Sequence, residues 1–329
     1  MIRLTKVEVR RLFSRRLTVI ALLGALALTG LMLFAGYQQA KPLTGAEITA
    51  NRTQFDQARK DFDLNGAQQV KDCLTQQAEV QKTDPKADLG CAGMEPKWET
   101  WGKPQAKFAT MMPNILLAAS YLMAFVGFVV GAGFLGAEFS SGSMANWLTF
   151  EPRRMRVFAS KLSAAGLGLA PVTVALLGLL TGGVWLIVGH FGSTAGTTAK
   201  VWGDLGMMGA RSLALALVSA VTGAAIGVLV RHTAAVLGIA VAYLVLVEAV
   251  FGQALQGFRP WLVSLNFQSW LEHSARYFVQ VCKTDAQGNY SCQGVEKILT
   301  FGHSTAYLGI MVVLIIGLAA VVFRRRDVS

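Results

Sequence analysis

The sequence predicts an all-α polytopic membrane protein with six transmembrane helices and both termini in the cytoplasm. Of its 329 residues, 53% are hydrophobic and only 15% are charged. The mean hydropathy of +0.46 is too high for a soluble domain. The apolar residues are gathered into six blocks, each close to the length of about 20 residues that a helix needs to cross a bilayer. Almost all of the net positive charge lies in the two terminal segments and in the segments between alternate blocks, which is typical of a multi-pass protein.

The six blocks define the expected spans. They are residues 17–36, 113–137, 162–189, 208–230, 233–252 and 305–323. The first block is long and lacks a strong small-residue cleavage site, so we expect a membrane anchor rather than a cleaved signal peptide.

The distribution of charge predicts the orientation. With both termini inside, the cytoplasmic segments are 1–16, 138–161, the turn at Arg231 and His232, and 324–329. They hold 14 of the 30 Lys and Arg residues but only four of the 19 acidic residues. Short basic flanks stay on the cytoplasmic side, so the opposite orientation is disfavoured. We expect a multi-pass protein of a bacterial plasma (inner) membrane.

The net charge of +11 is therefore explained by topology and by contact with anionic membrane lipid. No exposed basic surface interleaved with aromatic residues is evident, so no nucleic acid is expected as a partner. Residues 1–16 show no clean apolar stripe on a helical projection, which predicts a basic topology signal held at the inner leaflet.

All four cysteines fall in the two sizeable segments predicted to lie outside. An oxidising exterior favours one local disulfide in each segment, with four free thiols as the alternative. The expected pairs are Cys73 with Cys91 and Cys282 with Cys292. No CxxC spacing or paired histidine accompanies them, so we expect no metal site.

The external segments differ in their expected structure. In residues 37–112, Thr44 and Glu47 have the spacing of a capping box, and Asn65-Gly66 is expected to end a first helix, giving a helical hairpin. Residues 190–207 form a short loop. Residues 253–304 are expected to form short interfacial helices and two short extended pieces around a turn at 285–289.

Few residues in the spans carry chemistry. The sequence contains no HExxH, no GxSxG with a plausible triad and no glycine-rich phosphate loop, so we expect no catalytic residue and no ATP hydrolysis by this chain. Glu248 in the fifth span and Arg211 at the outer end of the fourth are candidates for a transport path or for a structural ion pair. Such scarce intramembrane charge disfavours a secondary transporter.

The second and fourth spans each carry a pair of glycines four residues apart, a spacing that lets another helix backbone approach closely. The pairs are Gly127 with Gly131 and Gly223 with Gly227.

The loop of residues 138–161 has the pattern of a docking element. Ser143 is expected to cap a short helix over residues 143–150, with Met144, Trp147 and Leu148 on one apolar face. Glu151 and Pro152 end this helix, and the basic residues Arg153, Arg154, Arg156 and Lys161 follow. An interfacial connector with positive-inside charges is the alternative.

This loop resembles the one that follows the second span in ABC-2 type transporter permeases. The residues that carry the resemblance are Glu138, Gly142-Ser143, Leu148, Pro152-Arg153 and Lys161. The six spans, the basic N-terminal segment and the C-terminal FRRRD agree with that family. The segment 37–112 is longer than in its compact members.

The resemblance implies a permease subunit that pairs with a second permease, identical or different, and exports an unidentified substrate. A separate cytosolic ABC ATPase would bind ATP and Mg and supply the energy, and this chain would bind no cofactor. The implied ATPase-coupling residues are Glu138, Ser143, Met144, Trp147, Leu148, Glu151, Arg153 and Arg154. An ATP-independent channel, or the membrane component of a sensory or assembly complex, remains as the alternative.

Overall fold

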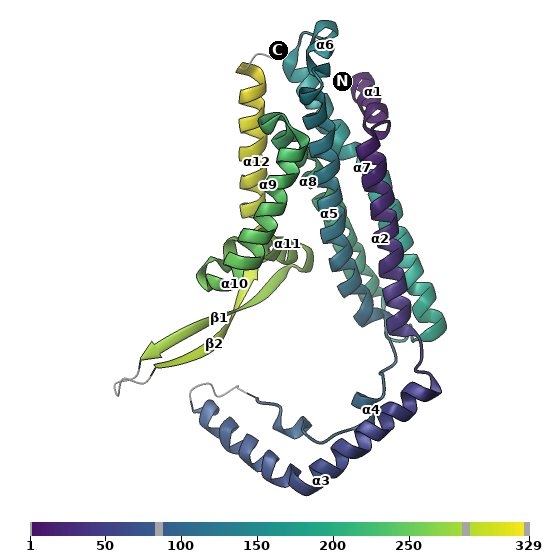
Figure 1. Ribbon diagram of the computed structural model, residues 1–329, viewed down its shortest axis with the longest axis vertical. Coiled ribbons are helices and arrows are strands. Elements are labelled where there is room, and N and C mark those ends of the chain that lie inside the picture. Colours follow the sequence, from purple (N-terminus) through teal and green to yellow (C-terminus); the bar gives the residue numbers. More distant parts are fainter. Residues whose placement is uncertain (1, 83–87, 285–289, 326–329) are drawn as a thin grey trace. The chain divides into compact units, whose positions relative to one another are not determined.

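The computed structural model describes residues 2–82, 88–284 and 290–325 (Figure 1). Within them, six helices are long and apolar enough to cross a membrane, which confirms the predicted number. Five of the six extend beyond the predicted apolar blocks, because the residues that flank each block continue the helix. The six are α2 (Arg16–Ala40), α5 (Phe108–Ser140), α7 (Arg154–Phe191), α8 (Ala199–Val230), α9 (Thr233–Ala242) continued by the π-helical η2 (Tyr243–Phe251), and α12 (Phe301–Arg325).

The chain divides into two compact units. Unit 1 comprises Met1–Ala35, Ala109–Val184 and Gly196–Ser329, and unit 2 comprises Gly36–Phe108 and Trp185–Ala195. Unit 1 contains most of every span. Unit 2 contains most of the predicted first external segment.

One end of unit 1 gathers α1 (Ile2–Phe13), α6 (Ser143–Phe150) and the C-terminal end of α12 (Figure 1). A core of buried apolar side chains joins these elements to α5, α7 and α8. Its members include Leu12, Phe134, Met144, Phe158 and Phe323. The beginning of α1 and the end of α12 therefore lie at the same end of the unit, as an even number of spans requires.

The glycine pairs lie where α5 and α8 pack on each other, a pairing that the sequence analysis did not predict. A Cβ atom on Gly131 would lie 1.9 Å from the carbonyl oxygen of Ala220, and one on Gly223 would lie 2.2 Å from that of Phe128. The two backbones are thus too close for any side chain at these positions, which is the packing expected of small residues in membrane helices.

The other end of unit 1 carries the elements between the fifth and sixth spans (Figure 1). They are α10 (Gly252–Ala254), η3 (Gln256–Trp261), α11 (Val263–Glu272), β1 (Ser274–Thr284) and β2 (Tyr290–Thr300). The two short extended segments predicted on either side of the turn are longer in the structure. They form the antiparallel strands β1 and β2, each of 11 residues. Cys282 lies opposite Cys292 and the two form the predicted disulfide. The expected turn at 285–289 and residues 326–329 of the tail lie outside the described residues.

Unit 2 is built on one helix rather than the predicted helical hairpin. The helix α3 (Gly45–Gln81) runs through Asn65-Gly66 without a break. A glycine inside a helix costs only about 1 kcal/mol, and Gly66 is covered by the ring of Phe62. The prediction that this dipeptide ends the helix was therefore wrong.

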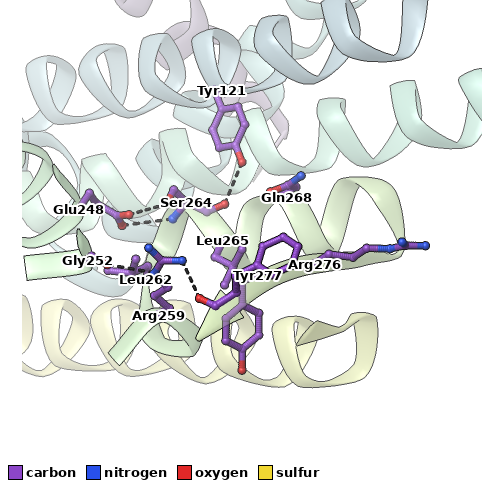
Figure 2. Close-up of a pocket in the computed structure, with 11 residues that line it drawn as sticks. Tyr121, Glu248, Gly252, Arg259, Leu262, Ser264, Leu265, Gln268, Arg276 and Tyr277 are labelled. Carbon is purple, nitrogen blue, oxygen red and sulfur yellow. Dashed lines mark hydrogen bonds between the residues drawn. The ribbon is translucent and has the colours of Figure 1, made fainter. Parts of the chain in front are cut away.

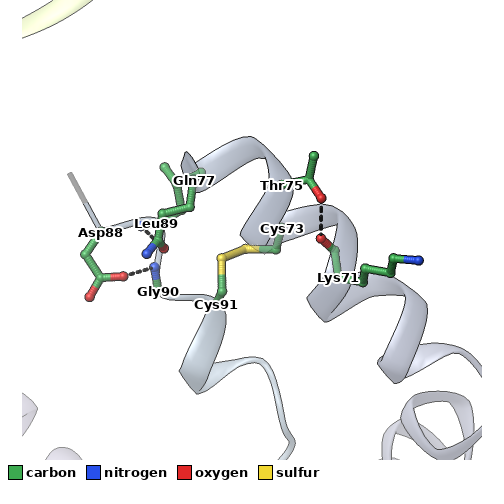
Figure 3. The surroundings of a disulfide bond; sticks show 8 residues. All are labelled: Lys71, Cys73, Thr75, Gln77, Asp88, Leu89, Gly90 and Cys91. Carbon is green, nitrogen blue, oxygen red and sulfur yellow. Dashed lines mark hydrogen bonds between the residues drawn. A yellow bond between two sulfur atoms is a disulfide. The ribbon is translucent and has the colours of Figure 1, made fainter. Parts of the chain in front are cut away.

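The start of α3 and the first disulfide agree with the sequence. Thr44 and Glu47 form a capping box, and the hydrogen bonds that the backbone N–H and hydroxyl of Thr44 donate lower the pKa of Glu47 from its ordinary value of 4.5. Cys73 of α3 is bonded to Cys91 of the short turn η1 (Cys91–Gly93), and Gln77 accepts a hydrogen bond of 3.0 Å from the backbone of Leu89 beside it (Figure 3).

Candidate functional site

The helix α6 forms where the sequence predicts it, over Ser143–Phe150. Its N-cap is Gly142, whose φ of 69° lies in the left-handed region that favours glycine. The prediction that Ser143 caps the helix was wrong, since its hydroxyl instead bonds to the carbonyl oxygen of Glu138 at 3.4 Å. Glu151 is the C-cap. The turn at Gly142 therefore directs α6 away from the axis of α5.

The apolar face of α6 packs against the protein itself. Met144 is only 1% exposed and belongs to the core at this end of unit 1, and Trp147 packs against the same core. The side chain of Leu148 lies outside the described ones. Met144 therefore anchors α6 to unit 1, and its side chain is buried rather than placed on an open docking face as the sequence analysis expected. The outward residues are different ones: Phe150 is 82% exposed, and Arg153 after it is also exposed.

A buried cluster of charged side chains lies beside α6. The ammonium group of Lys161, on α7, is 2.9 Å from a carboxylate oxygen of Glu8 on α1 and 2.6 Å from one of Glu138 on α5. Arg15 binds the other oxygen of Glu138 at 2.8 Å, and Arg11 lies 3.8 Å from Glu8. The side chains of Glu8 and Lys161 are fully buried. Because isolated charges are costly to bury, this ionic cluster holds α1, α5 and α7 in one fixed arrangement.

Aromatic rings connect the ionic cluster to α6. The guanidinium of Arg11 lies 4.4 Å from the centre of the Trp147 ring. The Lys161 ammonium lies 5.8 Å from the same ring and 5.3 Å from that of Phe134. These distances are within the range of cation–π attraction. The N-terminal helix thus contacts the short helix directly.

The role of α1 was missed by the sequence analysis. Its buried face includes Glu8 and Leu12, so the stripe that contacts the bundle contains a carboxylate. Hydropathy counts Glu8 as polar and thereby hides the stripe. Two features of the sequence could have indicated this contact. Glu8 is the single acidic residue among six basic residues in 1–16, and Lys161 directly precedes the third apolar block.

The structure gives Glu248 and Arg211 separate partners. Glu248 accepts hydrogen bonds from the hydroxyl of Tyr243 at 2.8 Å and from the backbone N–H of Ser264 at 3.2 Å, as well as from the Ser264 hydroxyl. Arg211 donates to the carbonyl oxygen of Leu271 at 3.2 Å and lies over the ring of Phe301. Among the described contacts, the predicted ion pair between Glu248 and Arg211 is not formed.

The comparison with protein families decides what class of protein this is. The family model described as ABC-2 family transporter protein matches residues 8–328. The chain belongs to this family. This ABC-2 family member is therefore a multi-pass membrane permease component of an ABC transporter, as the loop pattern indicated. No curated protein and no solved structure matches it.

The family match includes every member of the ionic cluster and the whole of α6. In the part of this ABC-2 permease that the structure describes, no group of three or more His, Cys, Asp or Glu residues could hold a metal ion.

Proposed function

We propose that this chain is the permease subunit of an ATP-driven exporter in a bacterial plasma membrane, and that a separate cytosolic ABC ATPase drives it through α6. The observation that carries the proposal is that α6 has one face fixed to the ionic cluster and the opposite side open. An element that transmits force needs both a rigid attachment and a free contact surface.

The free surface has the chemistry of a protein interface. Phe150 offers a large aromatic side chain that is 82% exposed, and Arg153 and Arg156 are exposed beside it. Aromatic and arginine side chains dominate the energetics of protein contacts. A partner groove with an apolar floor and an acidic rim would complement them, and ATP and Mg would be held by that partner.

The proposed partner includes a second permease, identical or different. The apolar window of α9 and η2 is only 6% buried within the chain and that of α12 is 11% buried, against 56% for α5 and for α8. These exposed apolar faces require lipid or another permease to cover them. Export follows from the family resemblance and the substrate is unidentified.

Copurification tests the proposal. A tagged chain extracted from its native membranes in mild neutral detergent is expected to retain a P-loop ATPase, identified by mass spectrometry. The variant Phe150→Ser should weaken the association by about tenfold or more, because burying a phenylalanine contributes about 1.5–3 kcal/mol and each 1.4 kcal/mol is tenfold.

The matched control is Phe258→Ser, which removes an exposed phenylalanine at the other end of unit 1 and should leave the association unchanged. Absence of any P-loop ATPase from the wild-type preparation would reject an ATP-driven permease in favour of the ATP-independent alternative. Equal retention by the wild type and by Phe150→Ser and Arg153→Glu variants would reject α6 as the docking element.

A further inference from the structure

A pocket of about 400 Å³ lies at the end of unit 1 that carries the β-hairpin, between η2, α11 and β1 (Figure 2). Three charged residues line it, Glu248, Arg259 and Arg276. The other lining residues include Tyr121, Leu262 and Phe278. No part of the proposed coupling mechanism uses this pocket, which shares no residue with the ionic cluster.

Arg259 is held rigidly without being neutralised. Its Nε donates to the carbonyl oxygen of Gly252 at 3.3 Å, and an Nη donates to that of Phe278 at 2.8 Å (Figure 2). Both acceptors are uncharged, and none of the salt bridges among the described residues includes Arg259. A guanidinium has five N–H donors in a planar fork. Arg259 therefore holds its positive charge in a fixed position, and the two hydrogen bonds to Gly252 and Phe278 use only part of its N–H donors.

Among the described residues, the other charged groups at the pocket form no salt bridge with Arg259. Glu248 is engaged by three donors from Tyr243 and Ser264. Arg276 points away from Arg259 in Figure 2, and it lies 3.4 Å from Glu296 on the neighbouring strand. Of the two arginines at the pocket, Arg259 is the one without a salt-bridge partner among the described residues.

The surroundings of Arg259 are apolar and exposed. Leu255, Phe258 and Trp261 precede α11, and Trp261 is 51% exposed; Phe278 on β1 is 59% exposed. Exposed tryptophan and phenylalanine beside a basic residue are typical of the boundary between hydrocarbon and water. A ligand that is anionic at one end and apolar at the other would match both features.

We propose that this pocket binds an anionic amphiphile, with a phosphate or carboxylate headgroup on Arg259 and an apolar tail along Phe258 and Trp261. A lipid of the surrounding leaflet and an amphiphilic cargo share this chemistry, whereas free phosphate has the charge without the tail. The binding requires no ATPase, so its test is independent of the test of the coupling proposal.

The test uses the purified full-length chain in neutral detergent, titrated with short-chain phosphatidylglycerol and followed by native mass spectrometry. The matched neutral-headgroup probe is phosphatidylcholine of the same chain length, and inorganic phosphate supplies the charge alone. The wild type should bind phosphatidylglycerol about tenfold or more tightly than either, since a hydrogen bond to a charged group contributes about 1.5–3 kcal/mol. Equal affinity for phosphatidylcholine, or for inorganic phosphate, would overturn the proposal.

Two variants locate the site. Arg259→Gln should lose about tenfold in affinity for phosphatidylglycerol, while Arg276→Gln, which removes the arginine that points away, should retain it. Arg259→Lys keeps the charge but not the planar fork, so it should bind more tightly than Arg259→Gln, which separates loss of the ligand contact from loss of folding. Wild-type affinity in a folded Arg259→Gln variant would place the amphiphile elsewhere and refute the assignment.

Discussion

Replacing Lys161 by Met tests the ionic cluster most directly. The ammonium group lies between two buried carboxylates, 2.9 Å from Glu8 and 2.6 Å from Glu138. Methionine has nearly the same length and no charge. The substitution therefore removes the electrostatic contribution and leaves most of the packing in place.

The cost of this variant should fall mainly on Glu8. After the change, Glu138 keeps its hydrogen bond of 2.8 Å from Arg15, whereas Glu8 keeps only Arg11 at 3.8 Å. Removing one partner of a buried pair typically destabilises by about 3–5 kcal/mol, because it leaves a buried charge uncompensated. Adding Glu8→Gln to Lys161→Met should then recover more than half of the loss, and adding Glu138→Gln should recover much less.

The assay is the midpoint of denaturant-induced unfolding of the purified chain in detergent, followed by tryptophan fluorescence. Lys200→Met, which changes an exposed lysine at the start of α8, is the control and should change the stability by less than about 0.5 kcal/mol. A loss below about 1 kcal/mol for Lys161→Met, or equal recovery by the two glutamine substitutions, would refute the arrangement described for the cluster.

Three further outcomes are expected. Gly131→Ala should strongly destabilise the protein, because its Cβ would lie 1.9 Å from a backbone oxygen. Gly178→Ala, whose Cβ would meet nothing within 4 Å, is the control and should be neutral or stabilising. The thermal melting temperatures of the two variants are compared with that of the wild type. The capping box lowers the pKa of Glu47 from 4.5, so the stability that ionised Glu47 gives to the start of α3 is present at neutral pH and is lost as the pH falls through the lowered pKa. Amide hydrogen exchange at the start of α3, corrected for intrinsic rates, should therefore show fraying only in acid. A membrane-impermeant thiol reagent applied to intact cells after reduction should label all four cysteines, and protection of either pair would contradict the predicted orientation.

The spans could be predicted from sequence because a bilayer imposes a strong and simple requirement on composition. Each needs about 20 apolar residues, and every block of that length became a helix. The glycine spacing was informative for a similar reason, since close helix approach in a membrane demands small residues. Local signals were less reliable at Asn65-Gly66, because a glycine inside a long helix costs only about 1 kcal/mol and α3 continues through it.

The docking face was harder to predict because hydropathy does not distinguish a buried apolar face from an exposed one. The pattern Met144, Trp147 identified the apolar side of α6 correctly, but that side faces the bundle. That side packs on a core that includes Leu12 of α1, and the Trp147 ring meets the guanidinium of Arg11 from the same helix. The sequence shows the sign of each charge in residues 1–16 without showing which partner it meets.

The ionic cluster also constrains how α6 can move under the proposed function. If α6 moved alone, the Trp147 ring would lose its contacts with Arg11 and Lys161. If α7 separated from α1, the salt bridge between Lys161 and Glu8 would break. Such a separation carries the cost of about 3–5 kcal/mol that attends a broken buried pair. A rigid-body displacement of α1, α5, α6 and α7 together breaks none of these contacts, so it is the motion of lower energy. A push on Phe150 would therefore reach α2, the first span, through the N-terminal helix, as well as α5 and α7 on either side of the loop.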